Sequence, residues 1–422
     1  MSETALNVLT NLLSHPVHFP KVGKSGDLLV AEPPRPFVAP RLDIPGLDPA
    51  IIRKEIIFIE ASAAVGKSTL ARQVSATLEA PILDLAKVPV STGSLHTLLT
   101  GLEAADNSDP VAAFHEGRIP VIIDALDEGR LLSGEKDIER FLVTTAELLL
   151  SNRSVTSRPK LVFLARFESI ELARQWIELT APGITHATAK VEFFDEEGAS
   201  QLIQAYAATA AKPGSQYQQD PESARDFIAT YFDAIEASLG LAAGELWQNE
   251  QGRVFAGYAP VLAAVGSILA EIDDFATVAN NLKSQGGREA WGLVEAVLYE
   301  ILNREQAKLR KLLDTQCESE LPDRVYDAEE QMALLAQYVE SKPLEGTGRV
   351  ALPIADMEKY SDMIRTYLPH HPFIRRHEFG NAVLGSTLVA RAVYHGRSIS
   401  QDRLISLSRQ WRQSAPTRRP SR

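Results

Sequence analysis

The run from Ile56 to Leu70, IIFIEASAAVGKSTL, constrains the fold of this chain more than any other stretch. Its first part, IIFIE, is β-branched and aromatic, with charge before it and small residues after it, which is typical of a buried parallel strand. In the following STLARQVSATL, the apolar residues Leu70, Val74 and Leu78 have helical spacing. A strand, a loop of small residues and a helix in this order predict a phosphate-binding loop, or P-loop.

The loop departs from the P-loop pattern G-x-x-x-x-G-K-[ST] only at its first position. The four defined positions are occupied by Ala61, Gly66, Lys67 and Ser68. Alanine has the next smallest side chain after glycine and fits wherever φ is negative, whereas we expect Gly66 to lie where the backbone approaches a phosphate closely. We therefore expect Ala61 to be tolerated.

Each later residue of the loop has an expected task. Backbone N–H groups, together with the positive end of a helix that starts near Lys67, would hold the phosphates. The residues that supply these groups are Ala63, Ala64, Val65, Gly66, Lys67, Ser68 and Thr69. Lys67 would place its ammonium on the β- and γ-phosphates, and the Ser68 hydroxyl would join the Mg²⁺ shell. The alternative is a strand, turn and helix rich in small residues, with a surface lysine.

A second buried strand, in RIPVIIDALDEGR, ends at Asp124. We expect it to be a neighbour of the P-loop strand, with Asp127 and Glu128 following within one loop. Three acids beside a phosphate are unfavourable unless cations are present, which indicates a metal and water site. We assign Asp124 to magnesium and Glu128, with Asp127 helping, to orienting the attacking water. The alternative is that Asp124 caps a strand and that the two later acids form a turn.

A basic residue follows a third strand, KLVFLAR. Arg166 lies at the C-terminal end of this strand, at the edge where α/β sheets bind ligands, and we expect it to take part in the site. The alternative is a surface arginine paired with Glu168. Arg158 precedes the same strand and so starts on the wrong side of the sheet.

Composition excludes several classes of protein. The chain has 422 residues, 45% hydrophobic and 23% charged, which is near average for a soluble protein. Its longest uncharged apolar run, from Ala256 to Ala270, falls short of a membrane span. The N-terminus does not read as a secretory signal, and the single cysteine, Cys317, agrees with a reducing compartment. We expect a cytoplasmic protein with no membrane partner.

The charge distribution leaves one question open. A net charge of −12 opposes nonspecific binding to nucleic acid over the whole surface. The last twenty residues, however, carry arginines and no acid, and the final SAPTRRPSR is typical of a disordered tail. A local basic contact with nucleic acid is therefore left open.

The order of the patterns predicts an α/β domain followed by helices. Strands and helices alternate from Ile56, which predicts a parallel sheet with helices on both faces, and the strands stop after Phe194. The expected parts are an N-terminal helix and proline-rich lead-in (1–50), a P-loop NTPase domain (51–196), an all-α helical domain (197–345), a small helical or winged-helix-like unit (346–410) and a basic tail (411–422).

Together these motifs resemble the STAND class of P-loop NTPases, and NACHT-type modules in particular, over about residues 36 to 395. PFVAPRL is similar to the lead-in segment of these proteins, and APILDL to their second strand. PVIIDALDE looks like their extended Walker B motif, with Ala125 at a place usually held by glycine. LVFLAR is similar to the sensor strand that ends in arginine, and FFDEEGASQLIQAY to the entry into the first helical domain.

The resemblance also implies two distant site residues and a switch. GYAPVLAAV resembles the module whose proline, here Pro260, borders the adenine. FIRRHEFGNAVLGSTLVARAVY resembles the late segment whose histidine, here His377, reaches the bound diphosphate. Such modules are closed monomers with ADP and open homo-oligomers with ATP, reset by slow hydrolysis. Their effector or sensor would here lie on another chain.

Residue spacing alone supports only an Mg²⁺-dependent nucleotide-binding NTPase, without a preference between ATP and GTP. One alternative is an AAA-type ATPase that loads or remodels nucleic acid through the arginine tail. Another is a small-molecule kinase, which the paired acids after Asp124 disfavour because they suit water as the acceptor. A zinc site at His370, His371 and His377 is disfavoured by loose spacing and by the lack of a completing acid or cysteine.

Overall fold

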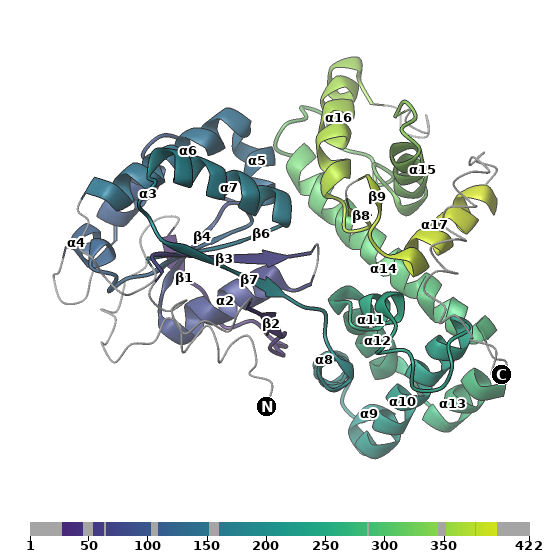
Figure 1. The fold of residues 1–422 in the computed structure, drawn as a ribbon. Helices are drawn as coiled ribbons and strands as arrows, with labels where there is room; N and C mark the ends of the chain where they lie inside the picture. The colour runs from purple at the N-terminus through teal and green to yellow at the C-terminus, as the bar shows by residue number, and fades with distance from the viewer. Residues whose placement is uncertain are drawn as a thin grey trace, which may run out of the picture. The chain divides into compact units, whose positions relative to one another are not determined.

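The computed structural model describes residues 28–44, 54–62, 65–102, 109–151, 160–284, 287–344, 352–375 and 377–394. The chain divides into two compact units, Met1–Phe193 and Phe194–Arg422 (Figure 1). The expected N-terminal helix, Arg158 and the basic tail lie outside the described residues. The second unit includes both the expected helical domain and the smaller segment after it.

The first unit is built on a seven-stranded sheet in the order β1-β4-β5-β6-β3-β7-β2. Its strands are β1 (Leu28–Val30), β2 (Leu42–Asp43), β3 (Ile56–Ala61), β4 (Pro81–Asp84), β5 (Val121–Asp124), β6 (Leu161–Ala165) and β7 (His186–Val191). The five central strands are parallel, whereas β1 and β2 add antiparallel edges on β4 and β7. The expected parallel sheet is confirmed, and the two short edge strands come from the proline-rich lead-in, where no strand was expected.

Helices cover both faces of this sheet. They are α2 (Lys67–Leu78), α3 (Ser94–Thr100), α4 (Pro110–His115), α5 (Leu126–Ser133), α6 (Glu135–Ser151) and α7 (Phe167–Thr180). Figure 1 shows α2 on one face and α5, α6 and α7 on the other. Every residue of β5 and β6 is therefore buried, which explains their continuous apolar runs.

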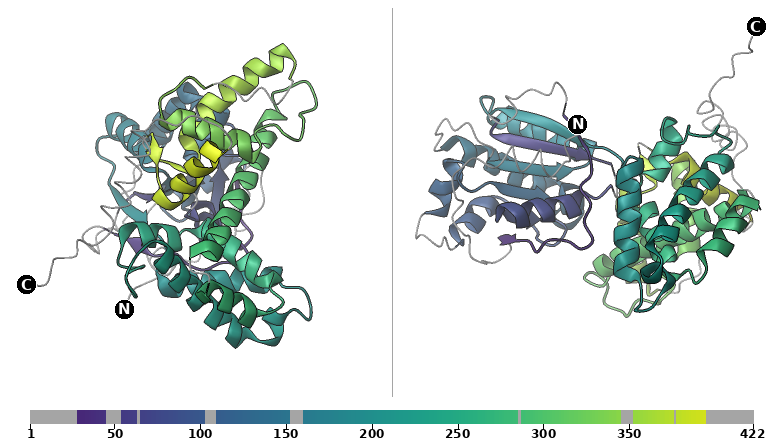
Figure 2. Two further views of the ribbon diagram at one scale, coloured as in Figure 1. Left: turned by 90° about the vertical axis from the view of Figure 1, so that its right-hand side faces the viewer. Right: turned by 90° about the horizontal axis from the view of Figure 1, so that it is seen from below.

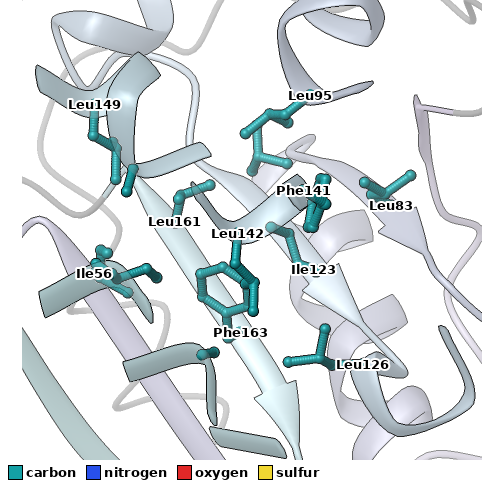
Figure 3. Packing of buried hydrophobic residues seen from close by; sticks show 14 of the residues in the cluster. Ile56, Leu83, Leu95, Ile123, Leu126, Phe141, Leu142, Leu149, Leu161 and Phe163 are labelled. Carbon is teal, nitrogen blue, oxygen red and sulfur yellow. The ribbon is translucent and has the colours of Figure 1, made fainter. Parts of the chain in front are cut away.

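The core of the first unit lies between the sheet and α6. Phe163 and Leu161 of β6 meet Phe141 and Leu142 of α6, and Ile56 of β3 belongs to the same cluster (Figure 3). These side chains are all fully buried. Burial of one large apolar side chain contributes about 1.5–3 kcal/mol, so this packing holds the central strands in place.

The strand order corrects one expectation about the site. The acidic strand β5 is not the neighbour of the P-loop strand β3, because β6 lies between them and pairs in parallel with both. Crossover connections determine which strands become neighbours, and they join strands that lie far apart in the sequence. All three strands still end at one edge of the sheet, so the residues after them are brought together.

Where the structure describes it, the second unit is helical apart from one small hairpin (Figure 2). Its elements are α8 (Glu196–Ala210), α9 (Gln216–Gln219), α10 (Pro221–Ser238), α11 (Glu250–Ala256), α12 (Ala259–Glu271), α13 (Phe275–Ser284), α14 (Gly287–Leu313), α15 (Ala328–Val339), α16 (Ile354–Tyr367), η3 (Leu368–His370), β8 (Ile374–Arg375), β9 (Glu378–Phe379) and α17 (Ala382–Tyr394).

A glycine brings two helices of this unit close together. A Cβ at Gly266 of α12 would lie 2.6 Å from the Cβ of Tyr206 and 2.7 Å from the carbonyl oxygen of Ile203, both on α8. Any larger residue would force α8 and α12 apart. In the described part of the chain, no single helix is long and apolar enough to cross a membrane, although α11 and α12, bent by 52°, pass that test as a pair.

A buried carboxylate ties α14 to α16. Glu305 accepts a hydrogen bond of 2.7 Å from the hydroxyl of Tyr367 and one of 2.8 Å from Nζ of Lys308. Burial acts to raise the pKa of Glu305, but the positive charges of Lys308, His371 and Arg304 outweigh it and hold the pKa below its ordinary value. The carboxylate is therefore ionised and paired inside the unit.

Candidate phosphate-binding site

Gly66 joins the loop to helix α2 in a left-handed backbone conformation. Its φ is 96° and its ψ is 19°, and it is the N-cap of α2, which begins at Lys67 as the sequence predicts. A Cβ added at Gly66 would meet no atom within 4 Å. Glycine is thus required here by backbone conformation, since L-residues rarely adopt this region. The expected close approach to a phosphate stays a prediction.

The alanine at the first motif position lies in regular structure. Ala61 is the last residue of β3 and pairs with Val191 of β7. An extended strand has negative φ, so alanine is accommodated without strain. Val65 is buried and Thr69 lies in the first turn of α2, whereas the expected phosphate-contacting Ala63 and Ala64 lie outside the described residues.

Asp127 links the two basic residues expected in the site. Its Oδ2 atom lies 3.3 Å from Nζ of Lys67 and 3.8 Å from Nε of Arg166, and it accepts a hydrogen bond of 3.1 Å from the backbone N–H of Arg166. The side chains of Lys67 and Asp127 are only 9% and 2% exposed. Burial acts to raise the pKa of Asp127, but Lys67 and Arg166 together lower it, so the carboxylate is ionised.

The two acids after Asp124 were expected to lie in a loop. They lie instead in the first turn of α5. The chain turns from β5 into α5 at Ala125, whose φ of 62° is left-handed. A left-handed conformation is costly for alanine, so glycine would fit this position with less strain. Asp127 and Glu128 benefit from the positive end of α5, where acidic side chains are stabilised.

Asp124 ends β5 in a fully buried position. Burial raises its pKa to about 7, the Ser68 hydroxyl beside it acts in the opposite direction, and the charge of Glu128 raises it further. An ionised carboxylate here is therefore costly without a cation. Ser68 itself is exposed in the first turn of α2, so its hydroxyl reaches both Asp124 and the outside.

The oxygens around Asp124 fit a magnesium ion. Oδ1 of Asp124 and Oε2 of Glu128 are buried and have no hydrogen-bond partner among the residues that the structure describes. Magnesium takes one or two carboxylates and keeps several waters, so Asp124 and Ser68 suffice as protein ligands. No cluster of three or more His, Cys, Asp or Glu side chains in the described ranges has the arrangement of a larger metal site.

Arg166 follows β6 directly and is the N-cap of α7. Its side chain is 15% exposed, which does not fit the alternative of a surface arginine. Two neighbouring residues were missed by sequence reasoning. Asp84 ends β4 in register with Asp124 and could have been found by the same strand-end rule, whereas Ser169, whose side chain bonds Asp127, carries no motif.

The two distant site residues lie in the second unit. Pro260 is buried at the start of α12. His377 is exposed in the turn between β8 and β9, with a φ of 63°, and stacks on Tyr338 of α15 with ring centroids 4.6 Å apart. Their contacts with a nucleotide stay predictions. His371 is buried elsewhere, with Nε2 3.3 Å from Oε1 of Gln331.

Comparisons with known proteins give distant structural matches. No protein-family model matches the chain, and no curated protein sequence matches it. The solved structures similar to it include the following three. The Walker-type ATPase of Pyrococcus abyssi matches with 12% identity, a TM-score of 0.42, and coverage of 81% of this chain and 92% of that chain. The ADP form of the Aeropyrum pernix ORC2 protein matches with 12% identity, a TM-score of 0.33 and coverage of 75% and 89%. A mutant RuvB of Thermotoga maritima matches with 16% identity, a TM-score of 0.27 and coverage of 63% and 69%. Matches at these values assign the chain to no family.

Proposed function

We propose that this chain is an Mg²⁺-dependent ATP-binding and ATP-hydrolysing switch of the STAND type, with a NACHT-like module. One observation carries the proposal: Lys67 and Ser68, which follow β3, come together with Asp124 and Asp127, at and after the end of β5, at one edge of the parallel sheet. This is the edge where α/β proteins bind ligands. A buried lysine, a hydroxyl and acids there suit a nucleotide phosphate with its cation better than an uncharged ligand.

Each residue has a distinct role in the proposed reaction. Lys67 binds the β- and γ-phosphates, the N–H groups at the start of α2 orient them, and Arg166 faces the developing charge. Ser68 and Asp124 hold Mg²⁺, which when bound neutralises phosphate charge. Glu128 accepts a proton from the attacking water. Its Oε2 atom, which has no hydrogen-bond partner among the described residues, supports this role.

The switch rests on the resemblance described above. ADP is proposed to bridge the sheet and the second unit through Pro260 and His377 and so to favour a closed monomer. ATP would favour an open homo-oligomer, and an effector or sensor on another chain would read that state. A ligand shifts such an equilibrium only by its differential affinity for the two forms, so the proposal requires different contacts in each.

Gel filtration separates this function from its alternatives. We expect a monomer with Mg-ADP and an oligomer with a nonhydrolysable ATP analogue. An AAA-type ATPase acting on nucleic acid would instead release phosphate faster when DNA is added. An unchanged elution volume with both nucleotides would contradict the switch while leaving nucleotide binding intact.

A further inference from the structure

The contacts of Asp127 differ from those of a water-orienting acid. Its oxygens face the ammonium of Lys67, the backbone N–H of Arg166 and the Ser169 side chain. It is 1% exposed, so water reaches it poorly. Glu128, one residue later, is only half-buried, and its Oε2 atom has no hydrogen-bond partner in the described part of the chain. The two adjacent acids therefore have different tasks.

The carboxylate of Asp127 also stabilises the start of α7. Arg166 is the N-cap of this helix and forms no side-chain cap of its own. Asp127 accepts a hydrogen bond from the N–H of Arg166 and places a negative charge at the positive end of the helix. The side chain of Asp127, in the first turn of α5, thus contacts the start of α7 and holds the backbone of Arg166 in place.

The ammonium of Lys67 has two possible anionic partners, the carboxylate of Asp127 and a nucleotide phosphate. Its ammonium pairs with Asp127, and the proposed function requires the same ammonium on the nucleotide phosphates. A charge pair in a buried site is screened less than one at the surface. Replacing the Asp127 carboxylate by a phosphate as the partner of Lys67 therefore costs a measurable part of the binding free energy. Nucleotide affinity therefore depends on the strength of the Lys67–Asp127 contact.

We propose that Asp127 is a positioning residue that competes with bound phosphate for the ammonium of Lys67 while it anchors Arg166 at the same sheet edge. This inference rests on the proposed function, because it assumes that phosphates bind near Lys67. It assigns Asp127 no proton transfer. Removing its charge should tighten nucleotide binding, whereas removing a water-orienting group would slow hydrolysis and leave affinity unchanged.

The test measures the Kd for a fluorescent ADP analogue, MANT-ADP, with Mg²⁺. We expect Asp127→Asn to lower the Kd about tenfold, because Lys67 no longer has a competing carboxylate, and Asp127→Glu to restore affinity close to wild type. Asp137→Asn is the matched control, since it removes an exposed carboxylate of the same unit that pairs with Arg140 of α6. An unchanged or raised Kd in Asp127→Asn, or an equal fall in Asp137→Asn, would overturn the proposal.

A second measurement needs neither the Asp127 variants nor a nucleotide. Lys67→Met keeps the length of the side chain but removes the charge that Asp127 pairs with. We expect the Tm of the protein without added nucleotide to fall by at least about 2 °C, because a buried carboxylate loses a partner. Lys87→Met, which breaks an exposed pair with Asp84, should leave the Tm unchanged.

The two experiments separate the inference from the proposed function. If the wild-type protein binds no MANT-ADP, the proposed function fails, but the Tm of Lys67→Met still reports on the contact. If the wild type binds and the Tm of Lys67→Met equals that of the wild type, the Lys67–Asp127 competition is refuted and nucleotide binding stands.

Discussion

Two glycine-to-alanine substitutions should change stability in opposite directions. Gly66 has a φ of 96°, and an added Cβ would meet nothing within 4 Å, so the cost of alanine there is purely conformational. The left-handed region costs alanine about 1–2 kcal/mol. The lower entropy of the unfolded alanine chain returns about 0.4–1 kcal/mol. Gly66→Ala should therefore destabilise the first unit by about 1 kcal/mol.

Gly292 is the matched control. It is exposed in helix α14, and a Cβ there also meets nothing within 4 Å. Because alanine has the higher helix propensity, Gly292→Ala should stabilise the second unit by about 0.5–1 kcal/mol.

Scanning calorimetry without nucleotide checks both substitutions. We expect a Tm lowered by about 2–4 °C for the first unit in Gly66→Ala and raised by up to about 4 °C for the second unit in Gly292→Ala. A Tm that is unchanged or raised in Gly66→Ala would refute the backbone argument for that glycine.

Three further predictions concern catalysis, the switch and pH. Glu128→Gln should keep MANT-ADP affinity but slow phosphate release by about 10²–10⁴-fold, because the amide cannot accept the water proton; normal turnover would show that another group is the base. His377→Leu should weaken ADP binding roughly 10- to 100-fold and raise the oligomeric fraction in gel filtration; an unchanged affinity and elution profile would confine the site to the first unit. The lowered pKa of Glu305 means that its contribution to stability is present above its ordinary pKa of 4.5 and is lost as pH falls through the folded value. The Tm of the second unit should therefore fall below pH 4.5 less steeply in Glu305→Gln than in the wild type, and equal slopes would contradict this.

The sequence predicts those features whose causes are local. The runs IIFIE, PVIID and KLVFLAR are apolar because both faces of their strands are covered, and each forms the expected strand. The small-residue loop with Lys67 likewise precedes a helix because Gly66 supplies a left-handed turn. Strand ends also give Asp124 and Arg166 their places at one edge.

The sequence does not predict features that depend on contacts between residues far apart in the chain. Edge strands of two and three residues, β2 and β1, leave no periodic pattern, and the place of β6 between β3 and β5 depends on crossovers. The contact between Asp127 and Lys67 joins residues that are 60 positions apart. No local pattern distinguishes Asp127 from Glu128, although tertiary structure gives them different partners.

The central claim is that the loop around Lys67 binds nucleotide phosphates. Its most direct test is a titration of wild-type protein and Lys67→Ala with MANT-ADP in the presence of Mg²⁺, with calorimetry confirming that the variant is folded. We expect saturable binding by the wild type and a loss of at least about tenfold in affinity in Lys67→Ala, because a buried charge on the phosphates is removed. Wild-type affinity in Lys67→Ala, or no binding by the wild type, would contradict the phosphate-binding assignment.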